Sequence, residues 1–265
     1  MIKDLTIIIP AHNEEKRISP TLDKYLSFFE KMKRENQINN YNIIIVLNNT
    51  SDKTEDIINE YQKLNVPLSY LKLIEGGKGL AVMAGFKEAL KGSSHLIGFV
   101  DADCATTPEE YFKLASSLNG CDGIIASRYL RGSIVNPTQS LKRIIVSRIF
   151  NLSIRLLFPE IQYKDTQCGA KIFKRNALSA IIDEVGTTQW AFDVDLLYQL
   201  VIRGYQIKEQ ATIWRDKEYS KLNLKKAGLK MVLALFRLRL WHSKLRWIVY
   251  LYNKLPEWIK IHHKI

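Results

Sequence analysis

The chain has 265 residues, of which 46% are hydrophobic and 25% are charged, and it carries a formal net charge of +12. This length and composition suit one large domain with a sizeable core and an appendage better than two equal domains. The three cysteines form no C-x-x-C pair and leave an odd count, which argues against a disulfide framework or a structural zinc site and favours a reducing compartment.

Strands and helices alternate along the first 220 residues, which predicts an α/β fold with a mixed, mostly parallel sheet flanked by helices. The expected strands cover residues 5–9, 42–47, 68–73, 95–101, 122–127, 170–173 and 207–214. The expected helices cover residues 19–36, 52–62, 79–91, a segment that begins at 107, 141–158 and 192–203. Ser19 before Pro20 predicts the N-cap of the first helix, and Thr107 the N-cap of the fourth.

No apolar stretch approaches the roughly 20 residues that cross a bilayer, so we expect no membrane span. The first apolar run carries Asp4 and breaks at Pro10, which is typical of a first strand and not of a signal peptide.

Two aspartates, Asp101 and Asp103, end the fourth expected strand. Open α/β sheets bind ligands at the carboxyl ends of their strands. Carboxylates at i and i+2 of an extended segment lie on one side of it and can share a hard divalent cation. The alternative is an ordinary turn, because Asp is common in turns. The surrounding sequence favours a metal that also holds a diphosphate.

Glycines surround Lys78 in the sequence GGKG at residues 76–79. They let the backbone turn tightly into a helix whose N-terminus favours anionic groups, with Lys78 as a point charge. The alternative is a glycine-rich loop without a ligand. Val82 stands where a dinucleotide fingerprint needs a small residue, and no G-x-x-x-x-G-K-[ST] motif is present, which excludes dehydrogenase and P-loop functions.

Most of the net charge lies in the last 45 residues. Residues 221–265 contain eleven Lys or Arg and one acidic residue, Glu257, so this segment carries +10. Three of the five tryptophans also lie there: Trp241, Trp247 and Trp258. Basic helices rich in Trp and Leu lie in lipid interfaces near anionic headgroups. We therefore expect residues 223–265 to form a basic amphipathic helical segment that binds a membrane surface.

Two other interpretations of this segment are open. One is a plain helical hairpin with solvated basic edges. The other, nucleic-acid binding, is disfavoured because no helix-turn-helix, RNP or zinc-finger pattern accompanies the charge.

Several motifs follow one another in the order typical of one known family. They are IIPAHNEE at residues 8–15, VLNNTSDKT at 46–54, KG at 78–79, DAD at 101–103 and SRY at 127–129. Together they resemble the family-2 glycosyltransferases of the GT-A, Rossmann-like fold. Three segments resemble the polyprenyl-phosphate branch, and within it the dolichyl-phosphate β-glucosyltransferases: DADCAT at 101–106, DTQCGAKIF at 165–173 and QWAFDVDLL at 189–197.

The resemblance implies a catalytic domain over residues 1–222 and a nucleotide-sugar donor at the edge of the sheet. The residues that would border the donor are Pro10, Ala11, Asn13, Glu14, Asn48, Lys78, Asp101, Ala102, Asp103, Arg215 and Lys221. Of these, Asp101 and Asp103 would hold Mg²⁺ or Mn²⁺ bridging the diphosphate. The family usually places an Asp against the nucleobase, whereas this chain has Leu47 and Asn48. An Asn carbonyl can accept the same hydrogen bond but its amide can donate, so uridine diphosphate is preferred without being fixed.

The resemblance also implies a polyprenyl-phosphate acceptor held by Arg128, Arg143 and Ser147. We expect an inverting displacement with Asp101, Asp103, Arg128 and Asp193 as its catalytic residues. A lipid phosphate is largely ionised at neutral pH and needs no strong general base. The leaving diphosphate, in contrast, must be neutralised by a metal and nearby cations. We expect Asp193 to contact the sugar or the acceptor, with a plain helix N-terminus as the alternative.

Three functions stay open at this point. The first is transfer of glucose from UDP-glucose to a polyprenyl or dolichyl phosphate, by a protein bound peripherally to the cytoplasmic face of a membrane. The second keeps the fold but uses GDP-mannose or UDP-GlcNAc as donor, or a polysaccharide or protein hydroxyl as acceptor, which would need Asp193 or Asp195 as general base. The third is a non-enzymatic nucleotide-sugar-binding module.

Overall fold

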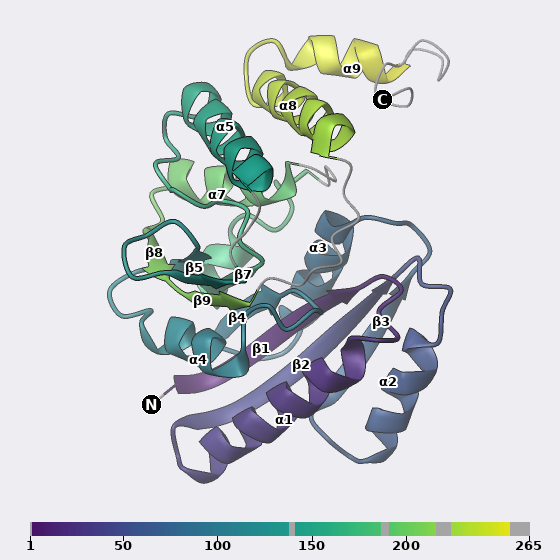
Figure 1. Cartoon of the computed structure of the whole chain (residues 1–265). Helices are drawn as coiled ribbons and strands as arrows, with labels where there is room; N and C mark the ends of the chain where they lie inside the picture. The colour runs from purple at the N-terminus through teal and green to yellow at the C-terminus, as the bar shows by residue number, and fades with distance from the viewer. Residues whose placement is uncertain (1, 138–140, 187–190, 216–223, 255–265) are drawn as a thin grey trace.

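A seven-stranded sheet forms the centre of the molecule (Figure 1). The computed structural model describes residues 2–137, 141–186, 191–215 and 224–254, and among these the side chains of all but residues 141–143, 224–230 and 253. The strand order is β3-β2-β1-β4-β7-β5-β8. The strands are β1 (Ile2–Ala11), β2 (Ile38–Asn48), β3 (Leu68–Leu73), β4 (Leu96–Val100), β5 (Gly123–Ser127), β7 (Ala170–Lys174) and β8 (Ile207–Ala211). Every neighbouring pair is parallel except those of β7, which runs antiparallel to β4 and β5. The predicted mixed, mostly parallel sheet is therefore confirmed.

The central strands are apolar on both faces because helices cover both. In β1, for example, Leu5, Ile7 and Ile8 are fully buried, with Ile7 in the core of one face and Ile8 in the core of the other. Continuous apolar runs of this kind are typical of parallel strands between two helical layers.

Helices α1 (Ile18–Arg34), α2 (Thr54–Lys63) and α4 (Pro108–Ser116) supply the core of one face, with Tyr25, Ile58 and Tyr111 among their buried residues. The opposite core is built by α3 (Lys78–Ala89), α5 (Leu141–Leu157), α6 (Arg175–Ser179), α7 (Phe192–Ile202) and α8 (Leu224–Trp241). The last helix is α9 (Arg246–Lys254).

The C-terminal segment takes part in the core. Leu235 and Leu238 of α8 are buried in the same cluster as Leu197 of α7, and His242 Nε2 lies 2.7 Å from Asp195 Oδ1. Figure 1 shows α5, α8 and α9 together at one end of the molecule. The described part of the predicted helical tail contains the helices α8 and α9, with a turn between them at residues 242–245. The predicted boundary between residues 222 and 223 lies outside the described residues, and the division into two domains stays a prediction.

We call α5, α8 and α9 the helical layer. Many of its apolar side chains are exposed, among them Ile149 and Leu156 of α5, Phe236 of α8 and Trp247 of α9. Within the described part of the chain, none of the helices combines the length and apolarity that a bilayer crossing requires.

Three details differ from the sequence-based expectations. The strand expected at 207–214 is two strands, β8 and β9 (Ile213–Arg215), and β9 pairs in parallel with the unexpected three-residue strand β6 (Ile134–Asn136). Helix α6 was not expected either. Ser19 is not the N-cap of α1: the helix begins earlier because the N–H groups of Arg17 and Ile18 both donate to the Glu14 carbonyl at 2.8 Å. The Thr107 cap is confirmed, since its side chain accepts from the Glu110 N–H.

Candidate active site

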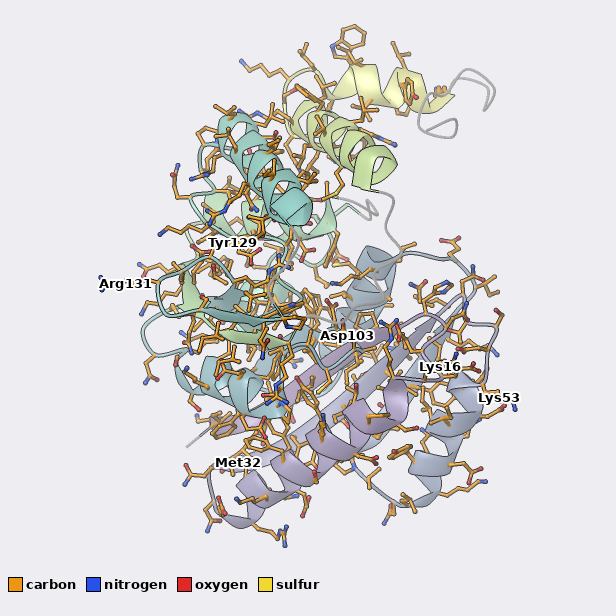
Figure 2. All side chains as sticks on the ribbon, in the orientation of Figure 1. Lys16, Met32, Lys53, Asp103, Tyr129 and Arg131 are labelled. Carbon is orange, nitrogen blue, oxygen red and sulfur yellow. The ribbon has the colours of Figure 1, made fainter. Side chains whose placement is uncertain are left out.

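A cleft of about 270 Å³ lies at the carboxyl ends of β1, β2 and β4. Its lining consists of Pro10, His12, Glu14, Arg17, Asn48, Lys78, Asp101, Ala102 and Asp103. Figure 2 labels Asp103 in the middle of the molecule, between α1 and the helical layer. Parallel strands present their carboxyl ends at one edge of a sheet, which explains why residues at the ends of β1, β2 and β4 meet here.

The backbone fixes the position of both aspartates of the acidic pair. The Asp101 N–H donates to the Gly169 carbonyl at 3.1 Å, and the Asp103 carboxylate accepts from the Ala105 N–H at 3.0 Å. The Asp101 carboxylate lies directly against Gly169: a Cβ atom at that position would stand 1.9 Å from Asp101 Oδ2. Gly169 is therefore required for Asp101 to keep this orientation.

The cleft concentrates negative charge. Burial raises the pKa of Asp103, and the neighbouring Asp101 charge raises it further. Burial also raises the pKa of Glu14 more than its ion pair with Arg17, 2.6 Å long, lowers it. Three carboxylates that repel one another in a partly buried cleft favour the binding of a cation.

Lys78, the first residue of α3, is the cation that contacts the acidic pair in this structure. Its Nζ lies 2.5 Å from Asp101 Oδ1, and its side chain is 38% exposed. Burial alone would lower the pKa of Lys78, but the charges of Asp101 and Asp193 outweigh burial and raise it. The lysine is therefore charged when it contacts the carboxylate.

The backbone before Lys78 links α3 to the end of β2. Gly77 has φ 150°, a conformation that residues with a side chain rarely adopt. Its N–H donates to Asn48 Oδ1 at 2.8 Å, and His12 Nδ1 lies 2.7 Å from the Asn48 carbonyl. Because Gly77 engages the carbonyl oxygen of the Asn48 side chain, the amide nitrogen is the part of that group left to meet a ligand.

The structure brings together most, but not all, of the residues predicted to border the donor. Ala11 is buried, and the Asn13 side chain accepts from the Ser51 and Asp52 N–H groups outside the cleft lining. Arg215 is exposed on β9, and its N–H donates to the Ala105 carbonyl. Lys221 lies outside the described residues. His12 and Arg17 line the cleft although sequence reasoning did not single them out.

Two buried ion pairs lie behind the acidic pair. Lys171 of β7 is fully buried, and its Nζ lies 2.6 Å from Asp193 Oδ1. Arg128 donates to both carboxylate oxygens of Asp165, at 2.7 Å from Nε and 2.9 Å from Nη2. Sequence reasoning missed Lys171, although a lysine within the apolar strand AKIF signals a buried partner.

Both aspartates of α7 are engaged by other residues. Asp193 accepts from Lys171, as described above. One oxygen of Asp195 pairs with His242, and the other accepts from the Gly186 N–H at 2.6 Å. Asp193 does not line the cleft, but its charge helps to raise the pKa of Lys78, which does. Asp195 instead connects α7 to His242, the residue that follows α8.

Two of the three residues predicted to bind the acceptor phosphate, Arg128 and Ser147, both contact Tyr129. Ser147 Oγ lies 2.7 Å from the Tyr129 hydroxyl, and the guanidinium carbons of Arg128 and Arg148 lie 5.6 and 4.4 Å from the centre of the Tyr129 ring. Arg143 belongs to α5, but its side chain lies outside the described residues.

The acidic pair fits a hard divalent cation. No group of three or more His, Cys, Asp or Glu side chains that could hold a metal occurs among the described residues. The chain thus offers two carboxylates, and the remaining ligands would be phosphate oxygens and water, the arrangement that Mg²⁺ favours at nucleotide sites.

Comparison with known proteins decides the family. The family model described as glycosyl transferase family 2 matches residues 6–182. The chain belongs to this family. This family-2 glycosyltransferase is 34% identical to the dolichyl-phosphate β-glucosyltransferase of Drosophila melanogaster over 88% of its own length and 73% of the relative's. It is 30% identical to the human enzyme of the same name, over 83% of this chain and 70% of that enzyme. The predicted enzyme class is confirmed.

Solved structures of more distant proteins share the fold of this glycosyltransferase. Glucosyl-3-phosphoglycerate synthase from Mycobacterium tuberculosis, in complex with UDP, has a TM-score of 0.64 at 16% identity, covering 89% of this chain and 78% of that one. The mannosyltransferase PcManGT from Pyrobaculum calidifontis, in complex with GDP-Man and Mn²⁺, has a TM-score of 0.61 at 14% identity, covering 97% and 72%. The expected GT-A fold is confirmed.

Proposed function

We propose that this protein transfers glucose from UDP-glucose to a polyprenyl phosphate such as dolichyl phosphate, with inversion at the anomeric carbon and with a divalent metal. The observation that carries the proposal is the acidic pair, Asp101 and Asp103, held in a cleft with Lys78 at the end of β4. The names of the relatives support the glucosyl donor and the dolichyl-phosphate acceptor. Neighbours of the same fold bind UDP and Mn²⁺ together.

Asp101 and Asp103 would hold the metal, and Asp101 is oriented for that role by Gly169. When bound, Mg²⁺ or Mn²⁺ acts as a Lewis acid that neutralises the departing diphosphate. Lys78 lies close enough to add a second positive charge to the same leaving group. The remaining lining residues, Pro10, Glu14 and Asn48, would border the nucleotide.

The state of the α7 aspartates favours a phosphate acceptor over a hydroxyl acceptor. A sugar or protein hydroxyl requires a general base with a free carboxylate oxygen directed at it. One oxygen of Asp193, Oδ1, is bound to a buried lysine, and both oxygens of Asp195 are bound to His242 and Gly186. An ionised lipid phosphate needs no such base. Arg128, Arg143 and Ser147 are the residues we propose for holding it.

The helical layer supports an acceptor that lies in a membrane. Ile145, Ile149, Leu152 and Leu156 follow one another at helical spacing on α5 and are exposed. Trp247, Ile248 and Leu251 of α9 are exposed as well. Helices α5, α8 and α9 contain basic residues but no Asp or Glu. An apolar surface with basic and no acidic residues suits an anionic lipid surface. We propose peripheral binding at the cytoplasmic face of a membrane.

A turnover assay with two donors and two acceptors tests the proposal. UDP-glucose with polyprenyl phosphate in vesicles and Mg²⁺ should give a lipid-linked β-glucoside, and chelation of the metal should stop its formation. GDP-mannose in place of UDP-glucose should give much less product. Product formed on oligosaccharide or peptide hydroxyls, with none on the lipid phosphate, would reject the proposed acceptor.

A further inference from the structure

The Lys78 ammonium contacts Asp101, one of the two carboxylates that would bind the proposed metal. Its Nζ lies 2.5 Å from Asp101 Oδ1. The acidic pair is therefore already partly neutralised without a metal.

A divalent cation on Asp101 and the Lys78 ammonium at its present position would repel each other at short range in this partly buried cleft. Lys78 must then move when the metal binds. It can do so, because the lysine side chain is long and flexible and this one is partly exposed to the cleft. A diphosphate arriving with the metal would supply new negative charge, next to the N-terminus of α3 where Lys78 begins the helix.

We propose that Lys78 is an internal cation that occupies the acidic pair until a metal–nucleotide complex displaces it, after which it binds the diphosphate. This inference rests on the proposed function and deepens it. Its consequence is synergy: the metal alone binds weakly because it competes with Lys78, and the nucleotide strengthens metal binding by giving the lysine another partner. A lysine with a purely structural ion pair would produce no such competition.

Binding of Mn²⁺ to the full chain, followed by the electron paramagnetic resonance of the free ion, tests the inference in the absence of sugar and lipid. Without nucleotide, Lys78→Met should bind Mn²⁺ at least about tenfold more tightly than the wild type, since a competing cation is gone. With UDP, the wild type should bind Mn²⁺ much more tightly than alone, and this gain should shrink in Lys78→Met. Lys78→Arg, which keeps the charge, should resemble the wild type.

The matched control is Lys72→Met. Lys72 also pairs with a carboxylate, Glu55, at 2.6 Å, but it lies on β3 and outside the cleft lining. It should leave Mn²⁺ binding unchanged. If Lys78→Met without nucleotide binds Mn²⁺ no more tightly than the wild type, the inference is wrong.

Two further measurements distinguish an error in the proposed metal site from an error in the proposed displacement of Lys78. If the wild type fails to bind Mn²⁺ even with UDP, the proposed metal site itself is wrong, which would reject the metal-dependent function and the inference together. Should Lys78→Met not fold, the wild type with ¹³C-methylated lysines provides a second test. The Lys78 signal, assigned with Lys78→Arg, should shift with Mg²⁺ and UDP together, and an unchanged signal would reject the displacement.

Discussion

The carboxyl edge of the sheet and the helical layer expose opposite kinds of side chain. At the sheet edge the accessible groups are charged and paired, as in Lys78 with Asp101 and Glu14 with Arg17. In the helical layer they are apolar: Leu156 is 75% exposed and Trp247 is 56% exposed. Monomeric soluble proteins rarely gather so much exposed apolar surface in one place.

The difference indicates two surfaces for two kinds of substrate. The charged cleft suits a nucleotide diphosphate with its metal, and the apolar layer suits a lipid. Arg128 and Tyr129 follow β5 directly, and the Tyr129 hydroxyl connects this position to Ser147 of α5 in the helical layer. The proposed reaction requires the two substrates to meet there. Four variants test this division and the ion pair that supports it, in order of decreasing expected effect.

Asp103→Asn should lower turnover by about three orders of magnitude or more, because it removes one of two metal-holding carboxylates. The measurement is the rate of lipid-linked glucoside formation at saturating UDP-glucose. Vesicle binding through the helical layer should be unchanged. Asp183→Asn is the control, since Asp183 is 85% exposed and lies outside the cleft lining. Near-normal turnover in Asp103→Asn would contradict the metal site.

Asp165→Asn should destabilise the fold by about 3–5 kcal/mol, because it leaves the guanidinium of Arg128 buried without its partner. Burial alone would raise the pKa of Asp165, but Arg128 holds it below its ordinary value of 3.8. The pair therefore stabilises the protein fully above that pH, and the contribution is lost as the pH falls through the lowered pKa.

Urea unfolding at several pH values measures this effect. The wild type should lose its advantage over Asp165→Asn only well into the acid range. Glu60→Gln, which removes an exposed ion pair with Lys63, should change stability little at any pH. A wild-type advantage that disappears near neutral pH would rule out the assignment to Asp165.

Gly169→Ala should reduce affinity for the metal–UDP complex by about a hundredfold, because the added methyl group displaces the Asp101 carboxylate. Calorimetric titration of UDP in the presence of Mn²⁺ measures the change. Gly92→Ala is the matched control, because a Cβ there meets only an ordinary contact, 3.6 Å from the Ala89 carbonyl. Equal affinities for the two variants would show that Asp101 has no part in holding the donor.

Replacing Trp247 and Leu251 together by Ser should weaken binding to anionic vesicles by about tenfold, because both side chains are exposed apolar groups of α9. Affinity for UDP should not change. Point variants are preferable to removal of the tail, because Leu235 and Leu238 of α8 belong to the core. Serines at Ile74 and Leu64, which are 91% and 67% exposed outside the helical layer, provide the control. Undiminished vesicle binding would reject the helical layer as the lipid surface.

Sequence reasoning succeeded where local pattern determines structure. Apolar runs predicted the seven strands of the main sheet, and the carboxyl ends of parallel strands share an edge. That rule alone places Pro10, Asn48 and Asp101 in one cleft, as observed. The confirmed Thr107 cap likewise depends on neighbouring residues only.

Sequence reasoning failed where contacts between distant segments determine the structure. The partner of Asp195 is His242, 47 positions away, and the partner of Asp193 is Lys171 on an antiparallel strand. No local pattern specifies which residues pack beside these carboxylates. The strand β6 was missed, and β9 was merged with β8, because each has only three residues and is too short to show a period. The two strands pair with each other, and Trp214 of β9 also forms a bridge with Thr106.

A crystal of the protein with UDP and Mn²⁺, measured at the manganese absorption edge, would show whether the acidic pair holds the metal. We expect an anomalous peak between the Asp101 and Asp103 carboxylates and the diphosphate, with the Lys78 ammonium moved from Asp101 onto a phosphate oxygen. Manganese bound elsewhere, or a diphosphate remote from both aspartates, would contradict it.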